Sequence, residues 1–164
     1  MNSKSKVANN IILETFFILI IVVVAGIVMM AFYKPATEIN EEFQKDTTID
    51  QSAKDTMQVT MNKYPSFFDG LLLTMLILLW IAVLVSAFMI DSHPAFFVVS
   101  LLLLIVLMIA GAIIGNGLEE ISGDSAMSSA SFPITTYIFS HFLLVLFIVG
   151  MSLMLVIYAK SRSG

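Results

Sequence analysis

Four long apolar stretches, separated by polar segments, dominate the pattern of residues along the chain. They run approximately over residues 11–32, 71–90, 95–114 and 134–158. About 20 apolar residues in a helix cross the roughly 30 Å hydrocarbon core of a bilayer, and lipid offers no partner to an unpaired backbone N–H. The pattern therefore predicts an all-α integral membrane protein, a single membrane domain with four transmembrane helices.

The first apolar stretch follows Lys4 and Lys6, as the apolar part of a signal peptide would. It is longer than the 7–15 apolar residues usual in signal peptides, and no A-x-A site precedes Lys34. We therefore expect a retained anchor.

The largest polar segment, residues 33–70, lies between the first two spans and predicts an extramembrane loop. Pro35 sits just beyond the first span. Thr37–Asp55 is expected to be helical, with Ile39 and Phe43 four residues apart on one side and charged residues on the others. These two apolar side chains, together with Met57, are the candidate contacts for a partner protein.

The second half of this loop is ambiguous. Met57, Met61 and Tyr64 are spaced for a helix, whereas residues 57–61 alternate as in a strand, and the pattern does not choose between them. Pro65 and Ser66 are expected to break the chain before the second span.

The other two connections are simpler. Residues 91–94 permit only a tight antiparallel turn, in which Asp91 or Ser92 caps the third helix and Pro94 occupies its first turn. Gly115 and Gly117 are expected to close the third span, before a polar loop that leads to the fourth.

The basic residues weakly favour one orientation. The positive-inside rule gives most weight to residues near the span ends, where the two termini outweigh Lys34. We expect both termini on the same, inner side and the loop 33–70 on the other.

Composition narrows the class of protein. Apolar residues make up 59% and charged residues 12%, against about 45–50% and 25% in soluble domains, and the mean hydropathy is +0.97. This excludes a cytosolic enzyme, a disordered tail and a nucleic-acid-binding module, and the net charge of −4 also argues against nucleic acid as a partner. The absence of cysteine excludes disulfides, thiolate metal sites and cysteine nucleophiles.

Two ionisable residues within the spans are candidates for chemistry, because charged groups in a bilayer are costly. Glu14 lies about one turn into the first span, on the same side as His93 in the favoured topology, so the two could pair. His141 lies two turns into the fourth span, next to Ser140. We interpret Glu14 as a solvated or paired carboxylate and His141 as an interhelical hydrogen-bonding group; a proton or ion site is the alternative for both.

Two further patterns have mainly structural interpretations. Gly111 and Gly115 are four residues apart, a spacing that lets helices approach closely, and we expect packing within the bundle, with a homo-oligomer as the alternative. Asp91 and His93 offer too few ligands for a structural zinc site. The chain lacks recognisable catalytic and phosphate-binding motifs, so no catalytic residue, metal or cofactor is expected.

Three segments carry a resemblance to a known group of proteins: Ile90–Phe97 at the start of the third span, Gly115–Glu120 at its end, and Phe132–Tyr137 at the start of the fourth. This pattern, over residues 90–158, resembles small multispan membrane proteins of bacterial viruses, including viruses with an internal membrane. The resemblance implies a virion membrane component beneath a capsid, and no catalytic residues.

The first hypothesis is therefore a non-enzymatic structural membrane protein of a larger assembly. It would reside in a virion internal membrane or a host cell membrane, in contact with lipid and with neighbouring membrane or capsid proteins. Two alternatives remain open: a holin-like pore-forming or channel protein, which requires a continuous polar stripe along a span, and an accessory subunit of a membrane complex.

Overall fold

A computed structural model describes residues 3–89, 94–123 and 131–163, and these residues are almost entirely helical. The helices are α1 (Ser3–Lys45), α2 (Gln51–Met89), α3 (Pro94–Gly123), α4 (Pro133–Ser140) and α5 (Phe142–Ser163). Four helical segments are long and apolar enough to cross a membrane: Leu13–Lys45, Gln51–Met89, Phe97–Ile121 and Phe142–Lys160. This confirms two parts of the prediction: the all-α class, and four apolar helices that are long enough to cross a membrane.

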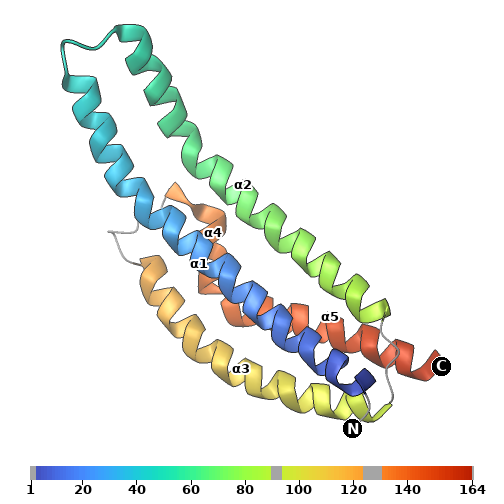
Figure 1. Cartoon of the computed structure of the whole chain (residues 1–164). Coiled ribbons are helices and arrows are strands. Elements are labelled where there is room, and N and C mark those ends of the chain that lie inside the picture. Colours follow the sequence, from blue (N-terminus) through green and yellow to red (C-terminus); the bar gives the residue numbers. More distant parts are fainter. Residues whose placement is uncertain (1–2, 90–93, 124–130, 164) are drawn as a thin grey trace.

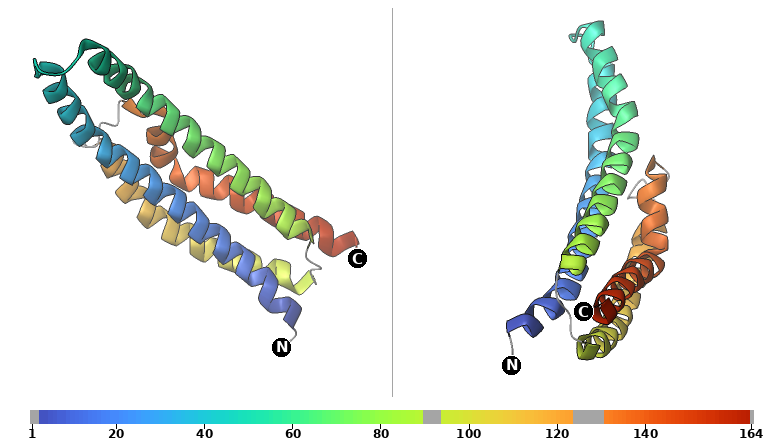
Figure 2. Two further views of the ribbon diagram at one scale, coloured as in Figure 1. Left: turned by 45° about the horizontal axis from the view of Figure 1, so that its top comes forward. Right: turned by 90° about the vertical axis from the view of Figure 1, so that its right-hand side faces the viewer.

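The long helices form an elongated bundle (Figures 1 and 2). α1 packs along α2, and α3 packs along α5; α5 also contacts α2, and α3 contacts α1. In Figure 1 the start of α1 and the end of α5 lie at the same end of the bundle, opposite the turn that joins α1 to α2.

Apolar side chains form two clusters inside this bundle. One lies around Phe16, Leu107 and Leu153, and the other around Met30, Leu72 and Phe139. The outer surface is also apolar, with exposed side chains such as Ile81 and Leu102. Soluble monomers rarely expose apolar surface on this scale, so the outside of the bundle has the character of a surface that faces lipid.

The segment between the first two spans is a helical hairpin rather than a separate loop. α1 continues through Pro35, and α2 continues through Pro65, so the expected break at Pro65 is wrong. A proline inside a helix costs about 3 kcal/mol. Side-by-side packing of α1 on α2 can offset this cost, and Pro65 itself is buried.

The expected helix Thr37–Asp55 is helical up to Lys45 and again from Gln51, but it is not continuous, because the chain turns at residues 46–50. The Asp46 carboxylate accepts hydrogen bonds from the Thr48 N–H and hydroxyl, at 2.8 and 2.7 Å. The Asp50 carboxylate accepts one from the Ser52 N–H at 3.1 Å, as an N-cap residue does. Residues 57–64 are helical, which settles the choice between helix and strand.

α3 does not end at Gly115 and Gly117 but continues to Gly123. Leu118 is only 3% exposed and packs with Phe132 and Phe142 in the second apolar cluster. Burial of this side chain, worth about 1.5–3 kcal/mol, offsets the roughly 1 kcal/mol that each glycine costs in a helix.

The fourth apolar stretch is divided at His141 into α4 and α5, whereas the sequence predicts one continuous helix without a mid-membrane break. His141 has φ −119° and ψ 25°. The Ser140 hydroxyl donates to the Thr136 carbonyl at 2.9 Å, and His141 Nδ1 lies 3.0 Å from the Tyr137 carbonyl. Such side-chain bonds compete with the helix and bend it, so this break needs neither glycine nor proline.

Candidate functional site

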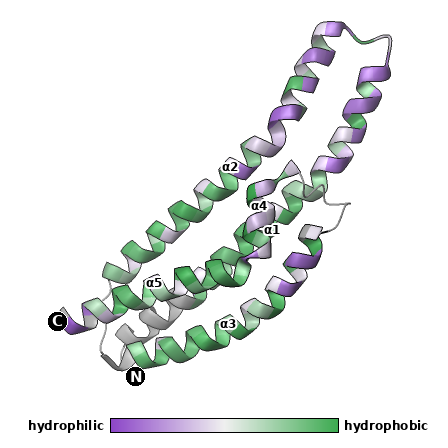
Figure 3. Ribbon diagram, turned by 180° about the vertical axis from the view of Figure 1, so that it is seen from behind, coloured by the Kyte–Doolittle hydropathy of each residue, from purple (hydrophilic) through white to green (hydrophobic). Residues whose placement is uncertain are grey.

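Residues 34–70 form the most prominent feature of the molecule, which we call the projecting hairpin. α1 has 43 residues and α2 has 39, so each is about 60 Å long, twice the hydrocarbon thickness of a bilayer. Hydrophilic residues are concentrated where these two helices extend past α3 and α4 (Figure 3). The hairpin therefore extends about 20–30 Å beyond the apolar bundle.

Polar side chains hold the two helices of the projecting hairpin together. The Asn40 amide donates to the Gln58 side-chain oxygen at 2.9 Å, and Asn40 is only 6% exposed. Nearer the tip, the Gln44 amide donates to the Lys54 carbonyl at 2.8 Å, and Lys54 Nζ donates to the Gln44 carbonyl at 2.9 Å. Because these bonds are directional, they fix the register of one helix against the other.

The projecting hairpin carries apolar side chains that nothing in the described chain covers. Ile39 is 60% exposed and Val59 is 52% exposed. The Asn40–Gln58 bond places these two residues at the same level along the hairpin. Phe43 and Met57, the other two predicted contacts, are half-buried. The sequence did not single out Val59, because it lies in the segment that could have been helix or strand.

A groove on the projecting hairpin has a volume of about 400 Å³ and a largely polar lining. The lining residues are Tyr33, Thr37, Asn40, Glu41, Gln44, Lys45, Gln58, Met61 and Asn62. The hairpin thus presents both exposed aliphatic side chains and a polar groove to a partner.

Aromatic rings anchor the base of the projecting hairpin to α4. Tyr33 and Tyr64 stack with ring centroids 5.6 Å apart, and Phe132 meets Tyr33 edge-on at 5.3 Å. Tyr64 also lies 4.3 Å from Phe68. Burial in this cluster raises the pKa of the Tyr64 phenol above its ordinary value. Ring contacts of this kind contribute about 0.5–1.5 kcal/mol each beyond burial, so they stabilise the base of the hairpin.

Asp69 caps α4 from another helix. Its carboxylate accepts hydrogen bonds from the Ile134 N–H at 2.8 Å, the Thr135 N–H at 3.0 Å and the Thr135 hydroxyl at 2.6 Å. Phe132, the N-cap residue of α4, makes no side-chain cap, so Asp69 supplies what the local sequence lacks. Negative charge at a helix N-terminus is favourable, and Asp69 is only 2% exposed.

Sequence reasoning missed Asp69 because the predicted loop extended to Gly70 and included it with exposed polar residues. The available signal was its position, since Asp69 is a single acid between an aromatic pair and an uninterrupted apolar stretch. An acid at such a boundary requires a partner when it is buried.

The two predicted intramembrane polar residues lie apart. Glu14 is exposed on α1, and its expected partner His93 lies outside the described residues. His141 is exposed at the α4–α5 break, where it stacks on Tyr137 with ring centroids 4.3 Å apart. Its described hydrogen-bond contact is to its own helix, not to a neighbouring helix as the interpretation required.

The two predicted packing glycines have different surroundings. A Cβ atom at Gly111 would meet Leu146 of α5, whereas no described atom beyond the local helix backbone lies within 4 Å of a Cβ atom at Gly115. Gly150 of α5, which the sequence did not single out, faces Leu104 of α3 in the same way. Gly111 and Gly150 thus let α3 and α5 approach each other closely.

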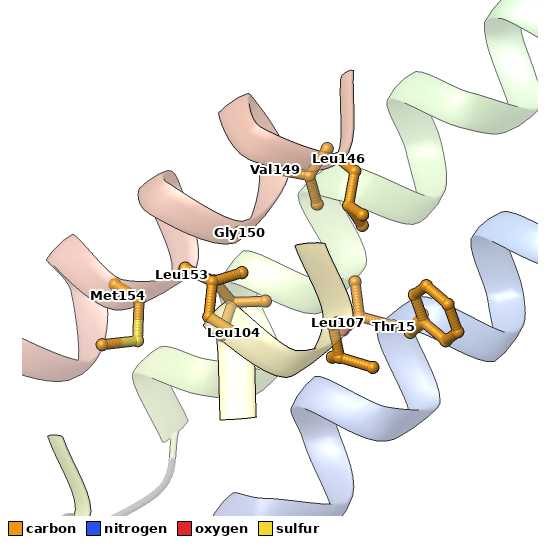
Figure 4. A pocket seen from close by; sticks show the side chains of 9 residues that line it. Thr15, Leu104, Leu107, Leu146, Val149, Gly150, Leu153 and Met154 are labelled. Carbon is orange, nitrogen blue, oxygen red and sulfur yellow. The ribbon is translucent and has the colours of Figure 1, made fainter. Parts of the chain in front are cut away.

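A small cavity between α1, α3 and α5 is almost entirely apolar (Figure 4). Its volume is about 20 Å³, and Thr15 is the single polar residue among the nine that line it. A stable buried water needs two to four polar partners, which this lining does not provide. The cavity is therefore better suited to remain dry than to conduct ions.

Two polar groups of the fourth apolar stretch join neighbouring helices. Thr135 binds Asp69, and the Ser152 hydroxyl accepts a hydrogen bond from the Trp80 indole N–H at 2.9 Å while it donates to the Val149 carbonyl at 2.7 Å. In the part of the chain that the structure describes, no group of three or more His, Asp or Glu residues could hold a metal ion.

Fold and site together define a class: an all-helical protein with four helices able to cross a membrane and one polar hairpin that extends beyond them. No protein-family model, no curated protein and no solved structure matches the chain.

Proposed function

We propose that this chain is a non-enzymatic structural membrane protein of a larger assembly, and specifically a virion membrane component beneath a capsid. Its four apolar helices anchor it in lipid, and the projecting hairpin contacts a neighbouring membrane or capsid protein. The observation that carries the proposal is the hairpin itself, a braced polar extension of two spans with exposed Ile39 and Val59.

The use of polar side chains supports a structural role. Asp69 caps α4, Asn40 joins the two helices of the projecting hairpin, and Ser152 binds Trp80. Each of these groups holds two helices together, and such a pattern favours a scaffold over a reaction centre.

The viral part of the proposal is supported by the resemblance of residues 90–158 to small membrane proteins of bacterial viruses. A protein beneath a capsid has to connect a lipid layer to a protein shell. A rigid hairpin that reaches about 20–30 Å past the bundle is suited to this task.

The test is copurification with the assembled particle. Replacement of Ile39 and Phe43 by Ser should lower incorporation into the particle about tenfold, because the loss of two apolar contacts costs about 1.4 kcal/mol or more. The amount of protein in the membrane should not change. The matched control replaces Glu38 and Glu42 by Ser, which keeps the helix and the four-residue spacing but changes polar, exposed positions.

Two results would contradict the proposal. One is normal incorporation of the Ile39/Phe43 variant, which would place recognition elsewhere. The other is single-channel conductance of the purified chain in planar bilayers, which would favour the holin-like alternative.

A further inference from the structure

A second cleft opens between α1 and α2, at the end of the bundle away from the projecting hairpin. Its volume is about 130 Å³. It is lined by Glu14, Thr15, Ile18, Leu79, Ala82, Val83 and Ser86. One carboxylate and two hydroxyls thus share a cleft with aliphatic side chains, an arrangement that neither the packing of the bundle nor the role of the hairpin explains.

The polar groups of this cleft favour a ligand that donates hydrogen bonds. Glu14 is exposed and makes no ion pair with a described side chain. The Ser86 hydroxyl donates its one hydrogen to the Ala82 carbonyl at 2.8 Å, so its oxygen can only accept further hydrogen bonds. A carboxylate is also an acceptor, so the cleft is complementary to a positively charged donor.

The end of α2 already binds one ammonium group of this chain. Lys160 Nζ donates to the Phe88 carbonyl at 2.7 Å and lies 5.0 Å from the centre of the Phe88 ring. The last carbonyls of a helix lack intrahelical partners and carry partial negative charge. Ser86 and Ala82 of the cleft lie on these last two turns, so the same field attracts a cation there.

The depth of the cleft matches that of a lipid headgroup. Ser86 lies three residues before Met89, the last residue of α2, which is about 4.5 Å along the helix axis. Leu79 lies about two turns deeper, so an aliphatic lining continues from the carboxylate toward the middle of the span. This order, with charge near the interface and aliphatic side chains below it, follows the order of headgroup and acyl chain in a phospholipid.

We infer that this cleft binds a phospholipid with a primary ammonium headgroup, of the phosphatidylethanolamine type. The ammonium contacts Glu14 and Ser86, and one acyl chain lies along Ile18, Leu79 and Val83. The inference rests on the membrane anchoring in the proposed function but not on the role of the projecting hairpin.

The chemistry of the cleft disfavours other cations. Calcium takes six to eight oxygen ligands and magnesium takes six, whereas the cleft offers one carboxylate and two hydroxyls. A choline headgroup has no N–H and cannot donate to these acceptors. A primary ammonium has three donors.

The test measures lipid binding to the purified full-length chain by native mass spectrometry. Two lipids with the same dioleoyl chains are compared: phosphatidylethanolamine, and phosphatidylcholine, in which the headgroup nitrogen carries three methyl groups. We expect the ethanolamine lipid to bind about tenfold more tightly, a difference of about 1.4 kcal/mol, because its ammonium donates a hydrogen bond to the Glu14 carboxylate and the trimethylammonium group cannot. Glu14→Gln should remove this preference, and Glu38→Gln, in the projecting hairpin, should not change it. Circular dichroism checks that each variant keeps its helix content.

Three outcomes would overturn the inference. Equal binding of the two lipids by the unmodified chain would show that the N–H donors are not recognised. A preference retained in Glu14→Gln would place the site elsewhere. Competition by free ethanolamine as effective as the lipid itself would show that the cleft binds an amine without an acyl chain. Carbonate extraction of the reconstituted chain from vesicles would separately test the membrane anchoring.

Discussion

Among single residues, Asp69 is a buried carboxylate whose partners lie in a distant segment of the chain. It is buried, and it accepts three hydrogen bonds from Ile134 and Thr135, which follow it in the chain by 65 and 66 residues. A carboxylate in this position is stable because backbone N–H groups at a helix start need an acceptor. The same bonds fix the position of α4 against α2.

Asp69→Ala should lower the free energy of unfolding in detergent micelles by about 3 kcal/mol, because it leaves buried N–H donors without partners. Thr135→Val removes only the hydroxyl bond and should cost about 1 kcal/mol. Denaturant titration followed by circular dichroism measures both, with the exposed Glu42→Ala as control. A cost for Asp69→Ala within about 0.5 kcal/mol of this control would contradict the capping role.

Asp46 gives the turn of the projecting hairpin a pH dependence. Its hydrogen bonds from the Thr48 side chain and backbone, followed by the charge of Lys54, hold the pKa of Asp46 below its ordinary value. Because the folded pKa is lower than the unfolded one, the stabilisation is present above about pH 3.9 and is lost as the pH falls through the folded pKa.

We therefore expect backbone amides of residues 46–50 to exchange hydrogen faster, relative to intrinsic rates, as the pH falls below about 3.9. Asp46→Asn should show faster exchange at neutral pH and little further change on acidification. Hydrogen-exchange mass spectrometry measures this directly. Identical pH profiles for the unmodified chain and Asp46→Asn would exclude the carboxylate as the cause.

At this scale the sequence predicts poorly which polar residues matter. Glu14 and His141 stand out in the sequence because they interrupt apolar stretches. The role of Asp69 does not, because its hydrogen-bond partners lie in a distant segment. Polar pairing depends on which helices meet, and residue spacing within one segment does not contain that information.

Among the helices, α3 and α5 pack against each other at two glycines. Gly111 faces Leu146, and Gly150 faces Leu104. Gly115 lies one turn beyond Gly111 on the same helix but has open space around it. The two glycines of α3 therefore give a matched pair for testing this contact.

Gly111→Leu should lower the free energy of unfolding by about 1–3 kcal/mol, because the added side chain overlaps Leu146 and forces the helices apart. Gly115→Leu should be neutral or slightly stabilising, since leucine favours the helix over glycine. Thermal unfolding in detergent micelles compares them. Equal destabilisation by both substitutions would contradict the α3–α5 packing.

The cores of the helices were predictable, and their ends were not. Within a bilayer, a long apolar stretch can pair all its backbone N–H and C=O groups only by forming a helix that crosses the membrane. The positions of the helix ends depend on several weaker free-energy contributions that oppose one another. Burial of Leu118 extends α3 through two glycines, packing on α1 extends α2 through Pro65, and side-chain bonds at Ser140 and His141 divide an unbroken apolar stretch.

In the whole molecule, polar and apolar residues occupy different parts of the length of the bundle. Hydrophobic residues predominate in the helices below the projecting hairpin, and hydrophilic residues gather at the hairpin (Figure 3). The ends of α1 and α5 lie opposite the hairpin in Figure 1. We therefore expect the hairpin to lie in water on one side of a bilayer and both chain ends to lie on the other side.

Single-cysteine accessibility labelling tests this arrangement most directly, because the chain contains no natural cysteine. Ser3→Cys, Lys45→Cys and Arg162→Cys are made separately and treated in sealed vesicles with a membrane-impermeant maleimide. We expect positions 3 and 162 to react from one side and position 45 from the other. Labelling of positions 3 and 45 from the same side would contradict the four-span anchor and the outward position of the projecting hairpin.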